Sequence, residues 1–159
     1  MKRTAKTNRS PKATLEAAVI ISLLRTADAL SRDFEVLLKS FNLSPAQYNV
    51  LRILRGAGEK GLACREIAGR LISRDPDITR LLDKLDSRGL IARTRETRDR
   101  RVVTTRITKE GLQLLAGLDE PMSETHRSQL GHVPEKKLRQ LAELLDLARE
   151  QTKKGDSPE

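Results

Sequence analysis

The sequence predicts a mainly α-helical fold, an α+β winged helix-turn-helix built from six helices and a small β-hairpin wing. Three observations support this class. Between residues 62 and 108, a short helical segment, a tight break and a second capped helix precede two runs with strand character. The turn between those runs is rich in arginine. Apolar residues at helical spacing extend on both sides, so long amphipathic helices are expected to flank this centre.

Two helices are expected before the centre. The first is predicted from residue 13 to about residue 40, where apolar residues recur at steps of three, four and seven. A single helix cannot bury this stripe, so the stripe must contact the body of the protein, another subunit, or both. Ser44, Pro45 and Gln47 supply an N-cap, a first-turn proline and a capping-box partner for the second helix. Apolar residues cover more than half of that helix, which is therefore expected to be buried on two sides.

The helix-turn-helix follows a short strand or turn at residues 61–63. Its first helix is predicted at residues 64–71. For its second helix the sequence predicts Asp75 as the N-cap, Pro76 as the first helical residue and Gly89 just beyond the end. The face opposite the apolar stripe is rich in hydrogen-bonding side chains, so it is predicted to be the reading face. That face carries Thr79, Arg80, Asp83 and Ser87, with Asp77 and Lys84 on its shoulders.

Two strands and two helices complete the prediction. Residues 90–94 and 102–107 are expected to be strands joined by the polar turn 95–101. Thr108 then caps a fifth helix, which is expected to break near Pro121 because proline lacks a backbone N–H. A loose polar stretch at 123–131 is expected to follow, and Pro134 opens the last helix.

The positive charge is concentrated in two segments. The chain has 31 basic and 22 acidic residues, a net charge of +9. Residues 1–12 contain five basic residues and no acidic one, while six arginines against Glu96 and Asp99 give residues 93–106 a net charge of +4. These two segments account for the whole excess. Such a concentration is typical of an electrostatic footprint on nucleic acid.

The reading helix suits the DNA major groove. Arg80 is the first candidate for a base or phosphate contact, with Thr79 beside it, whereas the alternative for Arg80 is a surface pair with Asp83. Asp77 either accepts a hydrogen bond from a cytosine amino group or caps the first turn.

The hairpin turn offers the stronger candidates. Arg101 is predicted to enter a narrow minor groove, where arginine meets an enhanced negative potential, and Asp99 is placed to orient it. Arg95, Arg98 and Arg100 are predicted to contact phosphates. The complete predicted DNA-binding set is Asp77, Thr79, Arg80, Lys84, Arg95, Arg98, Asp99, Arg100 and Arg101.

Other classes of site are not expected. The single cysteine, Cys64, lies on the inner face of its helix, and neither histidine belongs to a cluster with metal-ligand spacing. The sequence therefore predicts no metal, no cofactor and no enzymatic activity. No apolar run is long enough to span a bilayer, so a cytoplasmic protein without a membrane partner is expected. Phe34, Phe41 and Tyr48 lie near the junction of the first two helices, where core packing is the default and a cleft for a small effector is the alternative.

Several motifs, taken in order, resemble the MarR family of bacterial transcriptional regulators over roughly residues 15–150. The motifs that carry the resemblance are Leu43-Ser44, Cys64–Leu71, Ile78-Thr79-Arg80-Leu81-Leu82-Asp83-Lys84-Leu85, Arg88-Gly89-Leu90-Ile91, Asp99-Arg100-Arg101 and Ile107-Thr108-Lys109-Glu110-Gly111. A helix-turn-helix alone is weak support for a family, but this series of motifs is specific.

The resemblance implies a homodimer that binds a pseudo-palindromic operator in double-stranded DNA, as a repressor released by a small aromatic or anionic effector. It implies a dimerisation helix at 13–42, a DNA-binding domain at 43–108 and C-terminal dimerisation helices at 109–152. From the sequence itself, residues 1–12 are expected to be a disordered basic tail and residues 153–159 a frayed tail. Cys64 inherits no role, because the peroxide-sensing members carry their cysteine in the first helix. The alternative is a winged-helix module that binds nucleic acid without sequence preference or mediates protein interactions.

Overall fold

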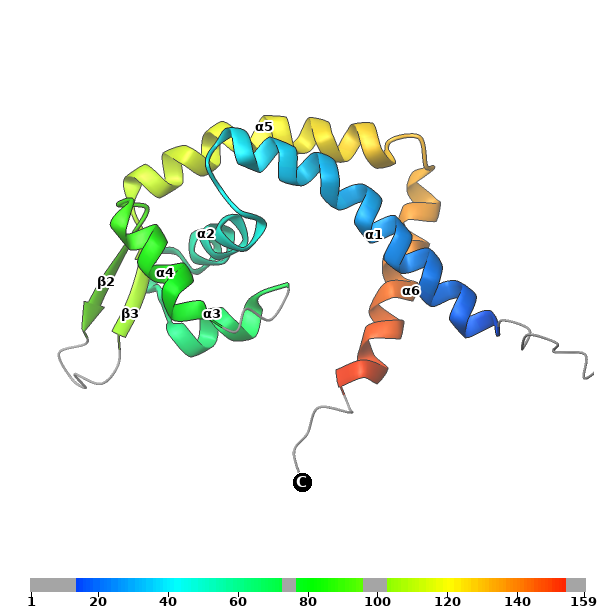
Figure 1. Cartoon of the computed structure of the whole chain (residues 1–159), viewed down its shortest axis with the longest axis horizontal. Coiled ribbons are helices and arrows are strands. Elements are labelled where there is room, and N and C mark those ends of the chain that lie inside the picture. The colour runs from blue at the N-terminus through cyan, green and yellow to red at the C-terminus, as the bar shows by residue number, and fades with distance from the viewer. Residues whose placement is uncertain (1–13, 73–76, 96–102, 154–159) are drawn as a thin grey trace, which may run out of the picture.

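The computed structural model describes residues 14–72, 77–95 and 103–153 (Figure 1). Within these ranges the chain forms six α-helices, one 3₁₀ turn and a three-stranded antiparallel sheet, as the sequence predicted for the fold class. The elements, in chain order, are α1 (Leu15–Ser40), α2 (Pro45–Ala57), the 3₁₀ turn (Gly58–Lys60), β1 (Leu62–Ala63), α3 (Cys64–Arg70), α4 (Ile78–Ser87), β2 (Ile91–Arg95), β3 (Val103–Ile107), α5 (Lys109–Leu130) and α6 (Glu135–Lys153).

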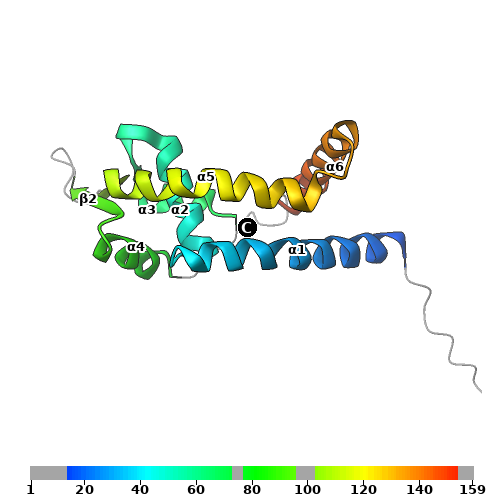
Figure 2. The ribbon, with the colours of Figure 1, turned by 90° about the horizontal axis from the view of Figure 1, so that it is seen from above.

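A body of short elements carries two long helical arms. Figure 1 shows α2, α3, α4 and the sheet gathered at one end, with α6 at the other. Figure 2 shows α1 and α5 running side by side away from this body. The core lies where α2 packs between α4, the sheet and α5, and its fully buried members include Leu51, Leu54, Ile67, Leu85 and Leu115. None of the described helices combines the length and the hydropathy that crossing a lipid bilayer requires.

The local start signals of α2 and α5 act as predicted. The Ser44 hydroxyl accepts a hydrogen bond from the Gln47 N–H at 3.2 Å, and the Gln47 side-chain oxygen accepts one from the Ser44 N–H at 2.9 Å. Together they form a capping box. Thr108 caps α5 by accepting a hydrogen bond from the Gly111 N–H at 3.1 Å. Both caps satisfy backbone donors that the first turn of a helix leaves free.

The end of α4 is confirmed, but its start is not where the sequence predicted. Gly89 has a φ of 68°, and the Gly89 and Leu90 N–H groups donate to the carbonyls of Asp86 and Leu85 at 2.8 and 3.0 Å. This is a Schellman motif. At the other end the N-cap is Asp77, not Asp75, because the Asp77 carboxylate reaches the Arg80 N–H at 3.0 Å. Asp75 and Pro76 lie outside the described residues.

The sheet contains the predicted hairpin and a third strand. Its order is β1-β3-β2, with Ile91 opposite Ile107 and Arg93 opposite Thr105. The short β1, which the sequence left open as a strand or a turn, pairs with the other edge of β3. Gly61, just before β1, has a φ of 64°, and a Cβ there would lie 2.6 Å from the Thr105 carbonyl oxygen. Glycine is therefore required for this close approach.

The predicted break in α5 near Pro121 is wrong. The helix continues through Pro121 to Leu130, and most of the stretch that was expected to be loose, 123–131, is helical. Proline removes one backbone hydrogen bond from a helix interior. Its neighbours Leu118 and Met122 are 0% and 4% exposed, however, so continuing the helix here buries apolar surface that outweighs the lost bond.

Candidate nucleic-acid interface

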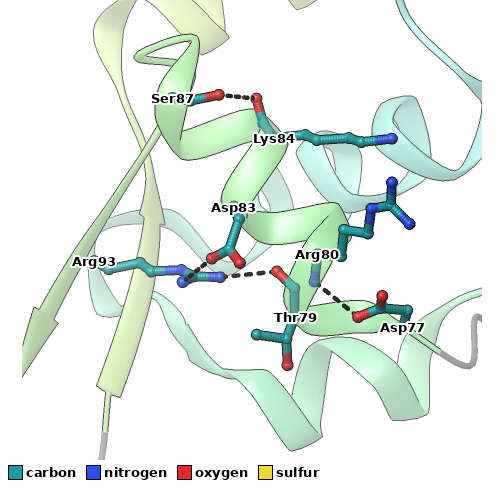
Figure 3. Close-up of polar contacts among 7 residues, drawn as sticks. All are labelled: Asp77, Thr79, Arg80, Asp83, Lys84, Ser87 and Arg93. Carbon is teal, nitrogen blue, oxygen red and sulfur yellow. Dashed lines mark hydrogen bonds and ion pairs between the residues drawn. The ribbon is translucent and has the colours of Figure 1, made fainter.

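The exposed face of α4 carries the predicted reading residues. Leu81, Leu82 and Leu85 turn inward and are buried, so the opposite side of the amphipathic helix faces solvent. Figure 3 shows six polar residues at this face, together with Arg93 of β2, and the polar contacts among them. The predicted reading residues Asp77, Thr79, Arg80, Asp83, Lys84 and Ser87 are all exposed.

Arg80 and Lys84 extend to the same side of α4 (Figure 3). The surface pair between Arg80 and Asp83, which was the alternative to a DNA contact, is not formed. The Arg80 guanidinium has no hydrogen-bond or ion-pair partner among the described residues. Both cations line an open polar hollow of about 420 Å³ between α4 and the start of α2, together with Ser44, Ala46, Gln47, Asp77 and Leu81. Two positive charges beside an open, polar hollow are suited to phosphate or base-edge acceptors.

Asp77 takes one of its two predicted roles. Its carboxylate caps α4 by accepting the Arg80 N–H. The cap stabilises the first turn of the helix and complements the positive end of the helix dipole. The backbone that presents Thr79 and Arg80 is thereby held in place.

Of the arginines in 93–106 that the structure describes, Arg93 and Arg106 form hydrogen bonds within the protein. The Arg93 guanidinium donates to the Asp83 carboxylate at 2.7 Å and to the Thr79 carbonyl at 3.4 Å. Arg106 donates through Nε to the Glu59 carbonyl oxygen at 2.7 Å. These two arginines, which are not in the predicted DNA-binding set, thus join elements of the fold to one another.

The remaining wing residues are placed only in part. Arg95 is the last residue of β2 and is exposed, at the end of the strand pair where the hairpin turn begins. The other four predicted wing contacts, Arg98, Asp99, Arg100 and Arg101, lie outside the described residues.

Two of the three aromatic residues meet in a cleft between α1 and α2. The rings of Phe34 and Tyr48 stand edge to face, with their centroids 5.5 Å apart and their planes at 74°. They line a cleft of about 230 Å³. Phe41 does not belong to it; that ring packs toward α5, 3.9 Å from where a Cβ on Gly117 would lie. The other residues of the cleft are Ser31, Glu35, Pro45, Ala46, Asn49, Arg52, Leu71 and Ile72.

Arg52 is the cleft residue that the sequence analysis missed. Its guanidinium carbon lies 5.8 Å from the centroid of the Tyr48 ring, within the range of a cation–π contact. Burial raises the pKa of Tyr48, while the positive charges of Arg52 and Arg55 oppose the rise. The phenol therefore stays protonated at neutral pH and can donate a hydrogen bond. Tyr48 and Arg52 are one helical turn apart in the sequence, and this spacing could have indicated that their side chains lie next to each other.

Cys64 is half-buried rather than fully buried. It lines a small hollow of about 150 Å³ between α4 and the sheet, with Thr79, Leu82, Arg93, Val103 and Thr105. Within the described part of the chain, no group of histidine, cysteine and acidic residues is arranged to hold a metal ion.

Comparison with known proteins gives consistent matches. A sequence model described as "MarR family" matches residues 43–103. The crystal structure of a MarR transcription factor from Planctomyces limnophilus is 42% identical, with a TM-score of 0.66, and the match covers 84% of this chain and 97% of that chain. NadR in complex with 4-hydroxyphenylacetate is 26% identical, with a TM-score of 0.71 and coverage of 87% and 97%. The homoprotocatechuate degradative operon repressor of Escherichia coli is 27% identical over 129 residues, 81% of this chain and 86% of that protein.

Proposed function

Because the chain belongs to the MarR family of transcriptional regulators, we propose that it represses transcription as a homodimer bound to a pseudo-palindromic operator in double-stranded DNA. The observation that carries the proposal is the exposed face of α4, where Arg80 and Lys84 are turned toward solvent on a helix whose other face is locked into the core. A helix of this kind fits the major groove, in which each base pair presents a distinct pattern of donors and acceptors.

The arms support the homodimer. Along α1, large apolar side chains remain exposed in the single chain: Leu15 is 77% exposed and Leu24 is 66% exposed. Together with Leu141 and Leu145 of α6 they line an apolar groove of about 790 Å³. Exposed apolar surface of this extent needs a partner. We assign dimerisation to residues 13–42 and 109–152, and DNA binding to 43–108, so that a two-fold axis places one α4 on each half-site.

The DNA contacts are divided between helix and wing. Thr79 and Arg80 are assigned to base edges or phosphates, Lys84 to phosphate, and Asp77 to the cap that orders this turn. From the sequence, Arg95, Arg98 and Arg100 are assigned to phosphates, and Arg101 to the minor groove with Asp99 orienting it.

Arg80→Ala is expected to weaken binding to the operator by roughly 1–2 kcal/mol and to relax base preference at the contacted position. The operator is first selected from a random duplex library with the wild-type protein. Binding is then measured by fluorescence anisotropy with the operator and with a scrambled duplex. Arg139→Ala removes the same charge from α6 and serves as the control.

Three results would contradict or narrow the proposal. Wild-type operator affinity in Arg80→Ala would remove Arg80 from the interface. Equal weakening on both duplexes would make Arg80 a phosphate contact only. A library that yields no palindrome would favour the alternative function, a winged-helix module that binds nucleic acid without sequence preference or mediates protein interactions.

The cleft supports regulation by a small aromatic anion. Its walls are the edge-to-face rings of Phe34 and Tyr48, and Arg52 supplies a positive charge at one side. NadR, whose structure this chain resembles, holds 4-hydroxyphenylacetate, an aromatic carboxylate. A ligand that orders the junction of α1 and α2 would shift the arms relative to the DNA-binding domain and so change operator affinity.

Arg52→Gln is expected to weaken binding of 4-hydroxyphenylacetate about tenfold, because the carboxylate loses its cationic partner. The ligand is titrated while the melting temperature and release of the operator are followed. Arg139→Gln, which makes the same change on α6, should respond like wild type. Equal responses of Arg52→Gln and wild type would remove Arg52 from the site, and no response of any protein would reject this ligand while leaving DNA binding intact.

A further inference from the structure

We propose that Arg93 and Asp83 form a positioning pair that sets the wing against the reading helix, so that an acidic residue on the DNA-facing side strengthens operator binding. The inference rests on the proposed function, since it assumes that α4 and the wing read one operator together. Arg93 acts through Asp83 and Thr79 and does not itself contact DNA.

The guanidinium of Arg93, on β2, donates hydrogen bonds to two successive turns of α4. Arg93 donates to the Asp83 carboxylate at 2.7 Å and, by a longer and weaker bond, to the Thr79 carbonyl at 3.4 Å (Figure 3). Thr79 and Asp83 are one helical turn apart, so the two bonds restrain both the rotation of the helix and its position along the strand. The Arg93 side chain is 24% exposed and that of Asp83 is 59% exposed, so the guanidinium half of the pair is partly shielded while the carboxylate half faces solvent.

Side-chain packing alone does not fill the seam between α4 and the sheet. The hollow of about 150 Å³ that Cys64 lines lies there, bordered by Thr79 and Leu82 of α4 and by Val103 and Thr105 of β3. Arg93 also borders this hollow, and its Cα lies opposite Thr105, which is 1% exposed and fixed in the core. The polar bridge from Arg93 therefore supplies a restraint at a place where close packing is incomplete.

The negative charge of Asp83 distinguishes a positioning role from other roles by the direction in which operator affinity changes when the charge is removed. An acidic side chain on a DNA-facing helix repels phosphates, so removing an ordinary surface acid should tighten binding. If Arg93 were a phosphate contact that Asp83 restrains, releasing it would also tighten binding. A positioning pair predicts weaker operator binding instead. Without Asp83, the wing is no longer held at the angle at which the wing and α4 contact the operator together.

The experiment compares Asp83→Asn, Arg93→Gln and the double variant with wild type, by fluorescence anisotropy on the selected operator and on a scrambled duplex across a salt series. Each single variant is expected to weaken operator binding on the order of tenfold per dimer, which contains two such pairs. The double variant is expected to be no weaker than either single one, since all three lose the same interaction. Arg93→Lys, which keeps the ion pair, should recover most of the affinity.

Asp86→Asn is the matched control, because it removes an exposed carboxylate from the same helix and should bind as well as wild type or slightly more tightly. If Asp83→Asn melts more than about 5 °C below wild type, it is replaced in the comparison by Asp83→Glu, which keeps the negative charge and changes the reach of the side chain. Tighter or unchanged operator binding by Asp83→Asn would overturn the inference. Arg93 would instead be a phosphate contact if Arg93→Gln lowered the log–log salt slope of operator binding by about one per subunit and Asp83→Asn bound more tightly. That pair of results would also overturn the inference. Wild-type protein that selects no operator would instead overturn the proposed function.

Discussion

Leu24→Glu is expected to convert the protein into a monomer and to lower operator affinity by at least about a hundredfold, because a single DNA-binding domain loses the gain from engaging two half-sites. Leu24 is 66% exposed in the single chain and lines the apolar groove between α1 and α6. In a homodimer the substitution would bury one unpaired carboxylate from each subunit, at a cost of several kcal/mol. Sedimentation velocity at low micromolar protein measures the first effect, and fluorescence anisotropy measures the second.

Arg25→Gln is the matched control for this change. It lowers the net charge by the same amount at the adjacent residue of α1, and Arg25 is not among the residues that line the groove. The control should sediment as a dimer and bind the operator like wild type. A wild-type protein that sediments as a folded monomer would contradict the assignment of the arms, and so would a Leu24→Glu dimer with full affinity.

Gly111→Ala is expected to lower the free energy of unfolding by about 2–3 kcal/mol, although glycine-to-alanine changes inside helices usually stabilise. A Cβ at this position would lie 2.3 Å from the Leu90 carbonyl oxygen and 2.7 Å from Cγ1 of Ile107. The Leu90 carbonyl cannot easily move, because it accepts the Thr108 N–H at 3.1 Å beside the Schellman motif of α4. Overpacking at this junction therefore separates α5 from β2. Urea unfolding at a fixed protein concentration measures the loss.

Gly117→Ala in the same helix is the internal comparison. Gly117 is exposed, and a Cβ added there would lie 3.9 Å from Cε1 of Phe41, which is an ordinary contact distance. This variant is expected to gain about 0.5–1 kcal/mol from helix propensity alone. If both variants gained stability, the close approach of α5 to Leu90 would not constrain Gly111.

Much of the fold could be predicted because its signals act over one or two turns. The capping box of Ser44 and Gln47, the Thr108 cap and the left-handed Gly89 each satisfy backbone groups within a few residues, so distant parts of the chain do not alter their outcome. The order of elements and the motifs of the reading helix are likewise local, which is why the family could be identified from the sequence.

Other features were decided by tertiary packing. Pro121 carries a strong local stop signal, yet α5 continues because the buried Leu118 and Met122 contribute more than one hydrogen bond. Two aspartates were suitable caps for α4, and in the structure Asp77 is the one that caps it, through its contact with the Arg80 N–H.

The roles of the arginines divide in the same way. The sequence by itself determined a basic hairpin next to a reading helix, and with it the class of partner. Only the tertiary structure decided that Arg93 pairs with Asp83, 10 residues away, and that Arg106 donates to Glu59, 47 residues away. It also turned Arg52 toward the ring of Tyr48 in the cleft. A guanidinium bonds to whichever acceptors the packed elements bring within reach, and that packing is set by burial summed over the whole core.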